Sequence, residues 1–204
     1  MTEAASCVVT GGTQAVVGAL AEALLELRLQ RVGPSEAGEA RRLAAQAHGW
    51  LHLIPSETGE EREVDLLTWA LDEAFEGLSP DSHSSFLALV PADGVHDGPD
   101  RAECDIASAA ARNAMRRCIA PWSERGLRLN VLEYGAVDLP PSPGRRPEST
   151  LVARTPMARL GTAREVADGI LFLLSEPASY VTGAVLRVDG GWGAYSWFYP
   201  AQEI

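Results

Sequence analysis

The sequence predicts a single α/β domain, spanning residues 1–204, built on a doubly wound parallel sheet. Short apolar runs alternate with amphipathic helical patterns along the chain, which is typical of parallel strands covered by helices on both faces. The first run, residues 6–10, leads into Gly11-Gly12, as a buried strand does when it enters a turn. A chain of this length is large enough to bury one substantial core.

Each element is expected from a local pattern. The apolar runs predict strands at residues 6–10, 28–32, 50–54, 85–90, 127–132 and 185–188. Apolar residues at helical spacing predict helices at about 16–27, 35–47, 61–78, 105–124 and 162–175, of which 61–78 has the clearest stripe. Ser35 is a candidate cap for the second helix, and Thr162 with Glu165 forms a capping-box pattern at the start of the last. Residues 138–149 contain four prolines and two arginines, which predicts a loop.

Composition excludes several classes of function. The net charge of −11 and the pI of about 4.8 disfavour nucleic acids and anionic membranes as partners. Cys7, Cys104 and Cys118 have no CxxC spacing and no histidine cluster beside them, so neither a metal site nor a disulfide framework is expected. The opening residues do not resemble a signal peptide, and the apolar stretches are too short to span a bilayer. We therefore expect a cytoplasmic protein.

Residues 157–191, MARLGTAREVADGILFLLSEPASYVTGAVLRVDGG, carry the most specific pattern in the chain. They resemble the C-terminal third of the short-chain dehydrogenase/reductase family at Thr162, Glu165, Val166, Ala167, Phe172, Leu173, Ser175, Tyr180, Val181, Thr182, Gly183, Val188, Asp189, Gly190 and Gly191. The resemblance implies a Rossmann-type fold. It also implies a trimmed one, because a strand-helix segment between residues 30 and 50 is missing or collapsed compared with the family.

In that family the cofactor pyrophosphate binds a TGxxxGxG loop, whose glycines allow a tight turn and close approach of the backbone. Thr10 and Gly11 match this pattern, whereas Ala15 and Val17 stand at the second and third glycines. The β-branched side chain of Val17 blocks close approach. The loop is therefore either a weakened cofactor site or a strand-helix turn that binds nothing, and the second interpretation is favoured.

A second departure affects the adenine-ribose pocket. The family's Asn-Asn-Ala-Gly stretch after the corresponding strand is replaced by Ile54-Pro55-Ser56-Glu57. Together with the altered phosphate loop, this predicts that the chain binds no cofactor itself and that NADP(H) belongs to an active partner.

The positions of the catalytic residues follow from the RGIRVN-like stretch at residues 125–131, which fixes the register of the preceding helix. The tyrosine and lysine of the family's YxxxK motif fall on Cys104 and Ser108, and its serine falls near Pro91-Ala92. In working members the tyrosine transfers a proton, the lysine lowers the tyrosine pKa and the serine holds the substrate oxygen. A free thiol without a neighbouring cation replaces none of these roles, so we assign no catalytic, cofactor-binding or metal-binding residue.

A new acid-base set in the same cleft is the competing hypothesis. Tyr134 replaces the proline of the family's Pro-Gly pair and is adjacent to Glu133, and His96 and Asp97 lie in the loop before the catalytic helix. The interpretation we favour is that Tyr134 fills the vacant nicotinamide pocket and that His96-Asp97 is a polar loop.

Members of the family assemble through two helices that form a four-helix bundle and through their C-terminal tail. Aromatic and long apolar side chains in the matching segments are candidate anchors for a partner; the alternative is that some of them pack on the chain's own sheet. The candidates are Trp69, Phe75, Met115, Ile119, Trp122, Trp192, Trp197, Phe198 and Tyr199.

The resemblance thus favours a non-catalytic subunit of a heteromeric, NADP-dependent complex. Its partner would be an active short-chain dehydrogenase/reductase paralogue, in a heterotetramer. The short length and missing YxxxK motif are similar to the inactive reductase-like partner in aminocoumarin (novobiocin-type) antibiotic biosynthesis, where such pairs interconvert β-hydroxytyrosyl and β-ketotyrosyl groups on a carrier protein. The competing classes are an independent cofactor-free cyclase, dehydratase or isomerase, and a self-assembled binding protein.

Overall fold

The fold is taken from a computed structural model of the chain. The structure describes residues 5–11, 14–24, 27–53, 63–80, 84–95, 101–138 and 147–194. Within these ranges only the backbone is described at residues 5, 14–17, 27, 63, 101, 103 and 104.

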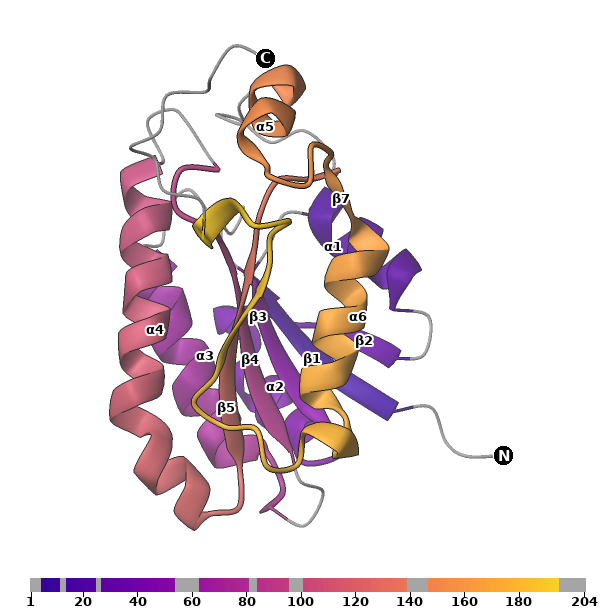
Figure 1. Cartoon of the computed structure of the whole chain (residues 1–204). Helices are drawn as coiled ribbons and strands as arrows, with labels where there is room; N and C mark the ends of the chain where they lie inside the picture. The colour runs from indigo at the N-terminus through magenta and orange to yellow at the C-terminus, as the bar shows by residue number, and fades with distance from the viewer. Residues whose placement is uncertain are drawn as a thin grey trace.

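A parallel sheet of six strands forms the centre of the molecule (Figure 1). Its strand order is β2-β1-β3-β4-β5-β8, with every neighbouring pair parallel. The strands are β1 (Ala5–Gly11), β2 (Leu27–Arg31), β3 (Gly49–Leu53), β4 (Ser85–Pro91), β5 (Arg128–Tyr134) and β8 (Val185–Val188). The predicted α/β architecture with a parallel Rossmann-like sheet is therefore confirmed.

Helices cover both faces of this sheet, because each strand needs a crossover to return to the same end. One layer consists of α2 (Ala37–Ala44), α3 (Glu63–Gly77) and α4 (Arg101–Glu124), and the other of α1 (Gln14–Ala23) and α6 (Ala163–Leu174). At the end of the sheet that receives the strand termini, β6 (Val137–Asp138) pairs with β7 (Gly161–Thr162), and α5 (Glu148–Arg154) lies above them. No helix among the described residues is long and apolar enough to cross a membrane.

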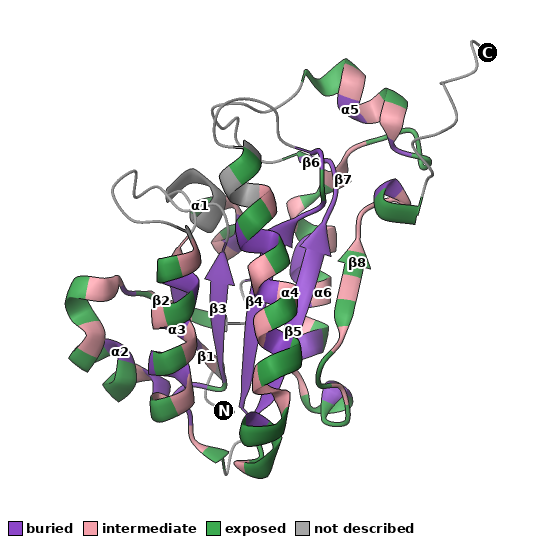
Figure 2. Cartoon of the chain, turned by 90° about the vertical axis from the view of Figure 1, so that its left-hand side faces the viewer, coloured by how far each residue is buried: buried purple, intermediate pink, exposed green. Residues whose placement is uncertain are grey.

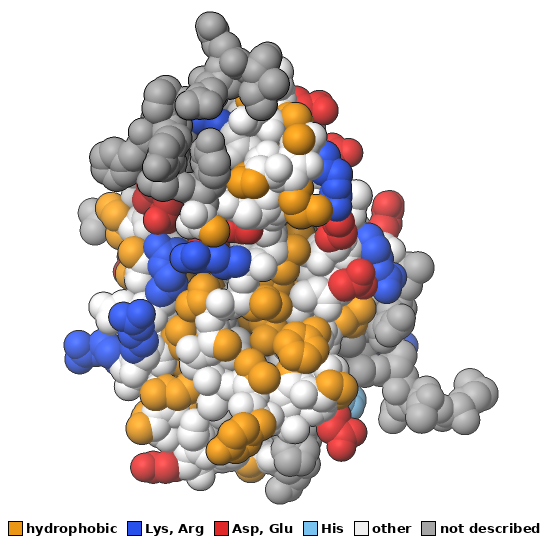
Figure 3. Space-filling view, in the orientation of Figure 1, with side chains coloured by type: hydrophobic (Ala, Val, Ile, Leu, Met, Phe, Trp, Pro, Cys, Tyr) orange, Lys and Arg blue, Asp and Glu red, His pale blue; other side chains and the backbone are white. Residues whose placement is uncertain are grey.

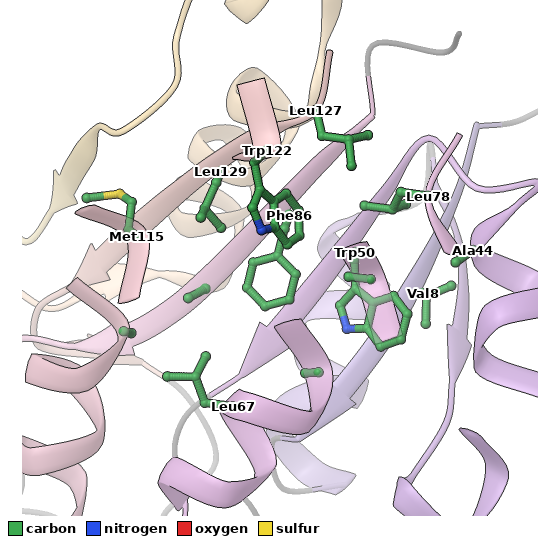
Figure 4. Close-up of a cluster of buried hydrophobic side chains, with 14 of the residues drawn as sticks. Val8, Ala44, Trp50, Leu67, Leu78, Phe86, Met115, Trp122, Leu127 and Leu129 are labelled. Atoms are coloured by element: carbon green, nitrogen blue, oxygen red, sulfur yellow. The ribbon is translucent and has the colours of Figure 1, made fainter. Parts of the chain in front are cut away.

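Two hydrophobic clusters, one on each face, hold the layers together. The cluster between the sheet and the α2-α3-α4 layer contains the largest buried rings, Trp50, Phe86 and Trp122 (Figure 4). Phe86 and Trp122 pack edge to face with ring centroids 5.8 Å apart, a favourable aromatic geometry. The other cluster joins α1 and α6 to the opposite face through aliphatic side chains, which leaves both faces of the central strands covered.

The elements expected from the sequence all form, with boundaries shifted by a few residues. Three details differ. Residues 148–154 form α5, of which only Glu148 and Ser149 belong to the segment 138–149 expected to be loop, and short β6 and β7 were not anticipated. Ser35 lies inside a 3₁₀ turn, Pro34–Glu36, and the cap of α2 is Glu36. The Thr162–Glu165 capping box is present as expected, with the Glu165 amide donating to the Thr162 hydroxyl at 3.2 Å.

The last strand, β8, differs from the central strands β3, β4 and β5 in its cover. Leu186 and Val188 pack against the α1-α6 side, while Val185 and Arg187 on the other face are exposed. Figure 2 shows this alternation on β8, at the lateral edge of the sheet that also contains the fully buried β4 and β5. The α4 layer therefore stops short of β8.

A buried polar network joins β1 to β3. The Thr10 hydroxyl accepts a hydrogen bond from Trp50 Nε1 at 2.9 Å and lies 2.9 Å from His52 Nδ1. His52 is fully buried and stacks on Phe86, and its Nε2 has no hydrogen-bond partner among the described residues. Burial without a charged partner lowers the pKa of His52 to about 3, so the ring is neutral at physiological pH.

This histidine predicts a specific acid sensitivity. An unfolded histidine has a pKa of about 6.5, so below that pH the unfolded chain binds a proton that the folded chain does not. The contribution of His52 is therefore fully present above pH ~6.5 and is lost as the pH falls, at about 1.4 kcal/mol per pH unit until the folded pKa is reached.

The check is denaturant unfolding of the wild type and of His52→Gln between pH 7 and 4. The stability difference between the two proteins should move in favour of the variant as the pH falls. His48→Gln, which removes an exposed histidine, is the matched control. Parallel curves for the wild type and His52→Gln would show that His52 is not neutral in the fold.

Candidate functional site

The carboxyl ends of the parallel strands meet at one end of the sheet, where ligands bind in open α/β folds. Gly11, Leu53, Pro91 and Tyr134 terminate β1, β3, β4 and β5 there. The positions expected for the cofactor loop, the catalytic serine and the nicotinamide contact all lie at this carboxyl end of the sheet. The candidate site is therefore built from the loops that follow these four strands and from the first half of α4.

The two residues that match the phosphate loop are accounted for by packing within the sheet. Gly11 has φ of +68°, and a Cβ placed on it would come within 2.3 Å of the Leu53 carbonyl oxygen. Only glycine fits such an approach. The Thr10 hydroxyl is engaged by Trp50 and His52 beneath the edge. These two matches therefore carry no evidence of phosphate binding.

The other positions of the cofactor site fall largely outside the described part of the chain. The side chains of Ala15 and Val17 are among those not described, and so is the whole of residues 54–57. The predictions made for them remain predictions.

The catalytic positions that are described hold groups without acid-base capacity. Ser108 faces the interior of the fold at 1% exposure, and its hydroxyl has no hydrogen-bond partner among the described residues. Pro91 ends β4, and the Ala92 amide donates to the Tyr134 carbonyl at 2.8 Å. Cys104 lies on α4, with its side chain undescribed. The 204 residues contain no lysine at all, so no ε-ammonium exists in this chain to lower a tyrosine pKa.

A charged network stands one helical turn further along α4. The buried carboxylate of Glu133 on β5 accepts from Arg112 of α4 at 3.2 Å and pairs with Arg187 of β8 at 3.4 Å. Arg112 also contacts the exposed carboxylate of Asp93, in the loop after β4, at 3.3 Å. The Glu133 side chain is only 6% exposed and those of the two arginines are 26% and 53% exposed, so a buried acidic side chain lies between two partly exposed arginines.

This arrangement separates the residues of the competing acid-base hypothesis. Glu133 faces α4, whereas the adjacent Tyr134 points to the opposite face of the sheet, because successive side chains of a strand alternate. Tyr134 is 6% exposed and packs in the α1-α6 cluster with Val137. His96 and Asp97 lie outside the described residues. Glu133 and Tyr134 therefore do not converge on one face of the sheet.

The segment after β8 folds back over the carboxyl end of the sheet. Gly135 approaches Asp189 so closely that a Cβ would lie 2.7 Å from its backbone. The Asp189 carboxylate accepts from the amides of Gly191 and Gly193, at 2.9 and 2.7 Å, and fixes the turn. Trp192 is then buried in a small cluster with its indole N–H donating to the Asp93 carbonyl at 3.0 Å.

These positions correct part of the expected partner surface. Met115 and Trp122 are 3% exposed within the α2-α3-α4 core, and Trp192 is 2% exposed, so their own chain covers all three. Trp69, Phe75 and Ile119 are partly exposed at the margin of that core. Trp197, Phe198 and Tyr199 lie outside the described residues. Aromatic content alone could not distinguish a core ring from an interface ring.

A separate cavity of about 330 Å³ lies between α6, β8 and the turn at Gly190-Gly191. Val137, Val166 and Val188 are among its apolar lining residues, and Arg159 and Glu165 lie at its polar side. Arg159 donates to Glu165 through two nitrogens, at 2.9 and 2.6 Å. This pairing, with the Thr162 amide, lowers the pKa of Glu165 to about 2. Both charges are thus satisfied internally.

In the described ranges no group of three or more His, Cys, Asp or Glu side chains could hold a metal ion.

Comparison with known proteins identifies the family. A family model described as enoyl-(acyl carrier protein) reductase matches residues 92–193, half of the chain. The chain belongs to the short-chain dehydrogenase/reductase family.

Individual relatives agree with this assignment. Cis-4-hydroxycyclohexanecarboxylate dehydrogenase of Sinomonas cyclohexanicum is 39% identical over 136 residues, which are 65% of this chain and 55% of that protein. Galactitol 2-dehydrogenase (L-tagatose-forming) of Cereibacter sphaeroides is 42% identical over 99 residues, 46% of this chain and 39% of that protein. The chain thus spans about half the length, or less, of these curated relatives.

Solved structures extend the likeness of fold over nearly the whole chain. An oxidoreductase of this family from Burkholderia thailandensis superposes with a TM-score of 0.72 at 18% identity, covering 96% of this chain and 95% of that one. A short-chain type dehydrogenase/reductase from Mycobacterium ulcerans gives 0.70 at 20% identity, covering 93% and 90%. At these identities the likeness concerns the fold alone.

The Glu133 network was not foreseen from the sequence, although one signal pointed to it. An acidic residue at a buried position of a strand must find a cation or a dense set of donors. The strand 128–134 contained that signal in Glu133, but nothing in the sequence showed that Arg112 and Arg187 would reach it.

The network predicts the effect of removing its central charge. Glu133→Ala leaves Arg112 and Arg187 close together without their shared carboxylate, so it should destabilise the fold by about 1–3 kcal/mol. Asp93→Ala removes a 72% exposed carboxylate from the same network and should cost about 0.5 kcal/mol or less. Chemical denaturation of both variants measures the difference. Equal losses of unfolding free energy in the two variants would show that the buried Glu133 contributes no more to stability than the exposed Asp93.

Proposed function

We propose that this chain is a non-catalytic subunit of a heteromeric, NADP-dependent short-chain dehydrogenase/reductase complex, with an active paralogue supplying cofactor and chemistry. The observation that carries the proposal is the state of the catalytic positions. A buried, neutral Ser108 stands where the family's lysine is expected, Pro91-Ala92 stands where its serine is expected, and the chain has no lysine. A proton relay cannot be assembled from these groups.

The described residues also fit a nicotinamide cofactor poorly. Tyr134 replaces a proline and packs in the apolar cluster, and Thr10 and Gly11 have structural roles inside the sheet. These observations support a cleft filled by the chain's own side chains. The cofactor, bound by the partner subunit, would accept a hydride from the substrate in the oxidising direction and return it in the reducing direction, and this chain would contribute stability and shape.

The substrate of such a complex is proposed from resemblance alone. The interconversion of β-hydroxytyrosyl and β-ketotyrosyl groups on a carrier protein is the reaction that fits the resemblance to inactive partners in antibiotic biosynthesis. Purified complex should then oxidise a carrier-bound β-hydroxytyrosyl thioester with NADP⁺, and turnover of free β-hydroxytyrosine alone would contradict the carrier requirement.

The alternative, an independent cofactor-free enzyme in the same cleft, requires an acid and a base that share a ligand. The opposite orientation of Glu133 and Tyr134 does not favour it. In this alternative His96 and Asp97 remain candidates for the acid and the base. A catalytic activity of the isolated chain that His96→Ala abolishes would support the alternative over the subunit proposal.

The isolated chain is predicted not to bind NADP(H) at physiological concentration. The reasons are Ala15 and Val17 in the phosphate loop and the replaced adenine-ribose stretch. Restoring Cys104→Tyr and Ser108→Lys together should leave the isolated chain inactive, because catalysis also needs a bound nicotinamide beside the tyrosine. Titration calorimetry of the wild type and NADPH oxidation by the double variant are the measurements. Micromolar binding or measurable oxidation would show a preserved cofactor site.

A complex with an active paralogue tests the proposed division of labour. Cys104→Ala in this chain should leave turnover per partner site nearly unchanged, whereas replacing the paralogue's own YxxxK tyrosine with phenylalanine should lower turnover by about 10²–10⁴. Both variants should elute with the wild-type complex in size exclusion. If Cys104→Ala abolishes turnover in an assembled complex, this chain contributes chemistry and the proposal is wrong.

A further inference from the structure

The side chain of Trp192 fills a niche at the carboxyl end of the sheet. Trp192 begins a short 3₁₀ turn, Trp192–Ala194, whose other residues are exposed, yet Trp192 itself is only 2% exposed. Its ring is therefore directed into the molecule from a turn at the surface. We call the ring and the buried apolar side chains that pack with it the Trp192 niche; these side chains belong to Ala92, Val95, Ala136 and Leu151.

The walls of the Trp192 niche come from segments that the family resemblance assigns to the substrate cleft. Ala92 follows β4 at the expected position of the catalytic serine. Ala136 follows Gly135, the glycine of the family's Pro-Gly pair beside the nicotinamide. Leu151 belongs to α5, which lies above this end of the sheet (Figure 1). The indole thus lies where a substrate would meet the expected serine and nicotinamide positions.

A fixed hydrogen-bond acceptor lies at the polar edge of the indole. The Nε1–H of Trp192 donates to the backbone carbonyl of Asp93 at 3.0 Å. The loop that carries this carbonyl is anchored on both sides, because the Ala92 amide donates to the Tyr134 carbonyl at 2.8 Å. The Val95 amide in turn donates to the Ala92 carbonyl at 3.2 Å. Apolar walls with one preset acceptor suit a flat aromatic ring that carries one donor.

We propose that the Trp192 niche is an aromatic-ring subsite of the cleft, which this chain occupies with its own indole. The ligand class is a flat aromatic group with one hydrogen-bond donor, such as an indole or a phenol, carried on a polar tail. The assignment to the substrate cleft rests on the proposed function. If it holds, a complex binds substrate on the active paralogue and not on this chain.

The tether makes the indole an effective competitor for its own niche. An occupant that is attached to the chain has an effective local concentration on the order of millimolar or above. A free ring that binds with millimolar affinity therefore does not displace it. The wild-type chain is expected to exclude the ligand, and removal of the indole should open the subsite.

The Trp192 niche lies next to solvent. Gly193 and Ala194 are exposed, and a Cβ placed on Gly193 would lie 3.4 Å from Arg187 Nε, so the turn adjoins the charged network. The side chains of Asp93 and Arg187 are 72% and 53% exposed. Figure 3 shows basic and acidic side chains together on the surface just below the turn that Figure 1 draws in yellow. A polar tail can therefore leave the niche beside this turn and remain solvated.

The test uses the isolated full chain and its variant Trp192→Ala with two probes. Indole reproduces the ring, and N-acetyltryptamine is the same ring with an amide-containing tail. Both should bind Trp192→Ala with a Kd on the order of 1 mM or tighter and raise its Tm. Neither should bind the wild type. Titration calorimetry and thermal unfolding are the measurements.

Trp122→Ala is the matched control. Trp122 is 3% exposed and lies in the main core between the sheet and α4, so its removal leaves space that the core encloses. This variant should not bind N-acetyltryptamine, whether or not it takes up indole. Benzofuran, a ring of similar size without a donor, should bind Trp192→Ala about two- to tenfold more weakly than indole, because the Asp93 carbonyl is left without its partner.

Amide exchange gives an independent measurement on α5. Leu151 is buried in the Trp192 niche, so residues 148–154 should exchange faster in Trp192→Ala and recover protection when either probe binds. If Trp192→Ala does not fold, Trp192→Leu keeps an aliphatic side chain in the niche and frees part of the space. The same probes and the same criteria then apply.

Three results would overturn the proposal. The first is a folded variant at position 192 that binds neither probe. The second is a variant that binds indole but not N-acetyltryptamine, as expected of an enclosed packing defect. The third is wild-type binding of N-acetyltryptamine as tight as that of Trp192→Ala, since the indole would then not occupy the site. These measurements need no paralogue, so they are independent of whether the proposed complex forms.

Discussion

A single buried carboxylate constrains the end of the sheet where the family performs its chemistry. Glu133 lies in the last buried strand, surrounded by apolar neighbours, and must be compensated by cations. Arg112 and Arg187 meet this requirement from two different elements, α4 and β8. This one charge therefore links α4 and β8 to the end of β5, while the hydrophobic cluster holds α4 against the sheet.

The network has a direct consequence for function. Arg112 is the cation nearest along α4 to the expected lysine position at Ser108, and it is already engaged by Glu133 and Asp93. An engaged guanidinium cannot lower the pKa of a distant group by the field that a free ammonium would provide, and arginine is not readily deprotonated. On α4 the cation nearest in sequence to the expected lysine position is thus paired with the carboxylates of Glu133 and Asp93.

The sequence was a good guide to the sheet and a weaker one to the surface. Strands and helices follow from periodicity that is set by local burial, so residues 85–90 and 162–175 could be assigned closely. Trp122 and Trp192 could not be assigned, because a ring suits a core and an interface equally well, and only the tertiary packing decides. The same limit applies to Glu133, whose partners are separated from it by 21 and 54 residues along the chain.

Short α5 illustrates a different limit. Its seven residues follow a proline-rich stretch, and an isolated helix of this length has little stability of its own. Leu151 is fully buried in the cluster that contains Trp192, so packing stabilises the helix from outside its own sequence. Hydrophobic periodicity cannot predict a helix of this kind, because a single buried side chain produces no repeating pattern in the sequence.

The distribution of buried and exposed apolar groups bears on the proposed role of the chain as a subunit. The central strands are covered on both faces, and Ala92 and Ser108, at two of the expected catalytic positions, are packed in the interior. The exposed apolar groups lie at the margin of the sheet, where β8 is the last strand and has one uncovered face. A protein selected only for its own stability gains nothing from leaving Val185, Phe172 and Tyr180 exposed together. Their exposure at this margin supports the proposal that the chain serves as a subunit of an assembly.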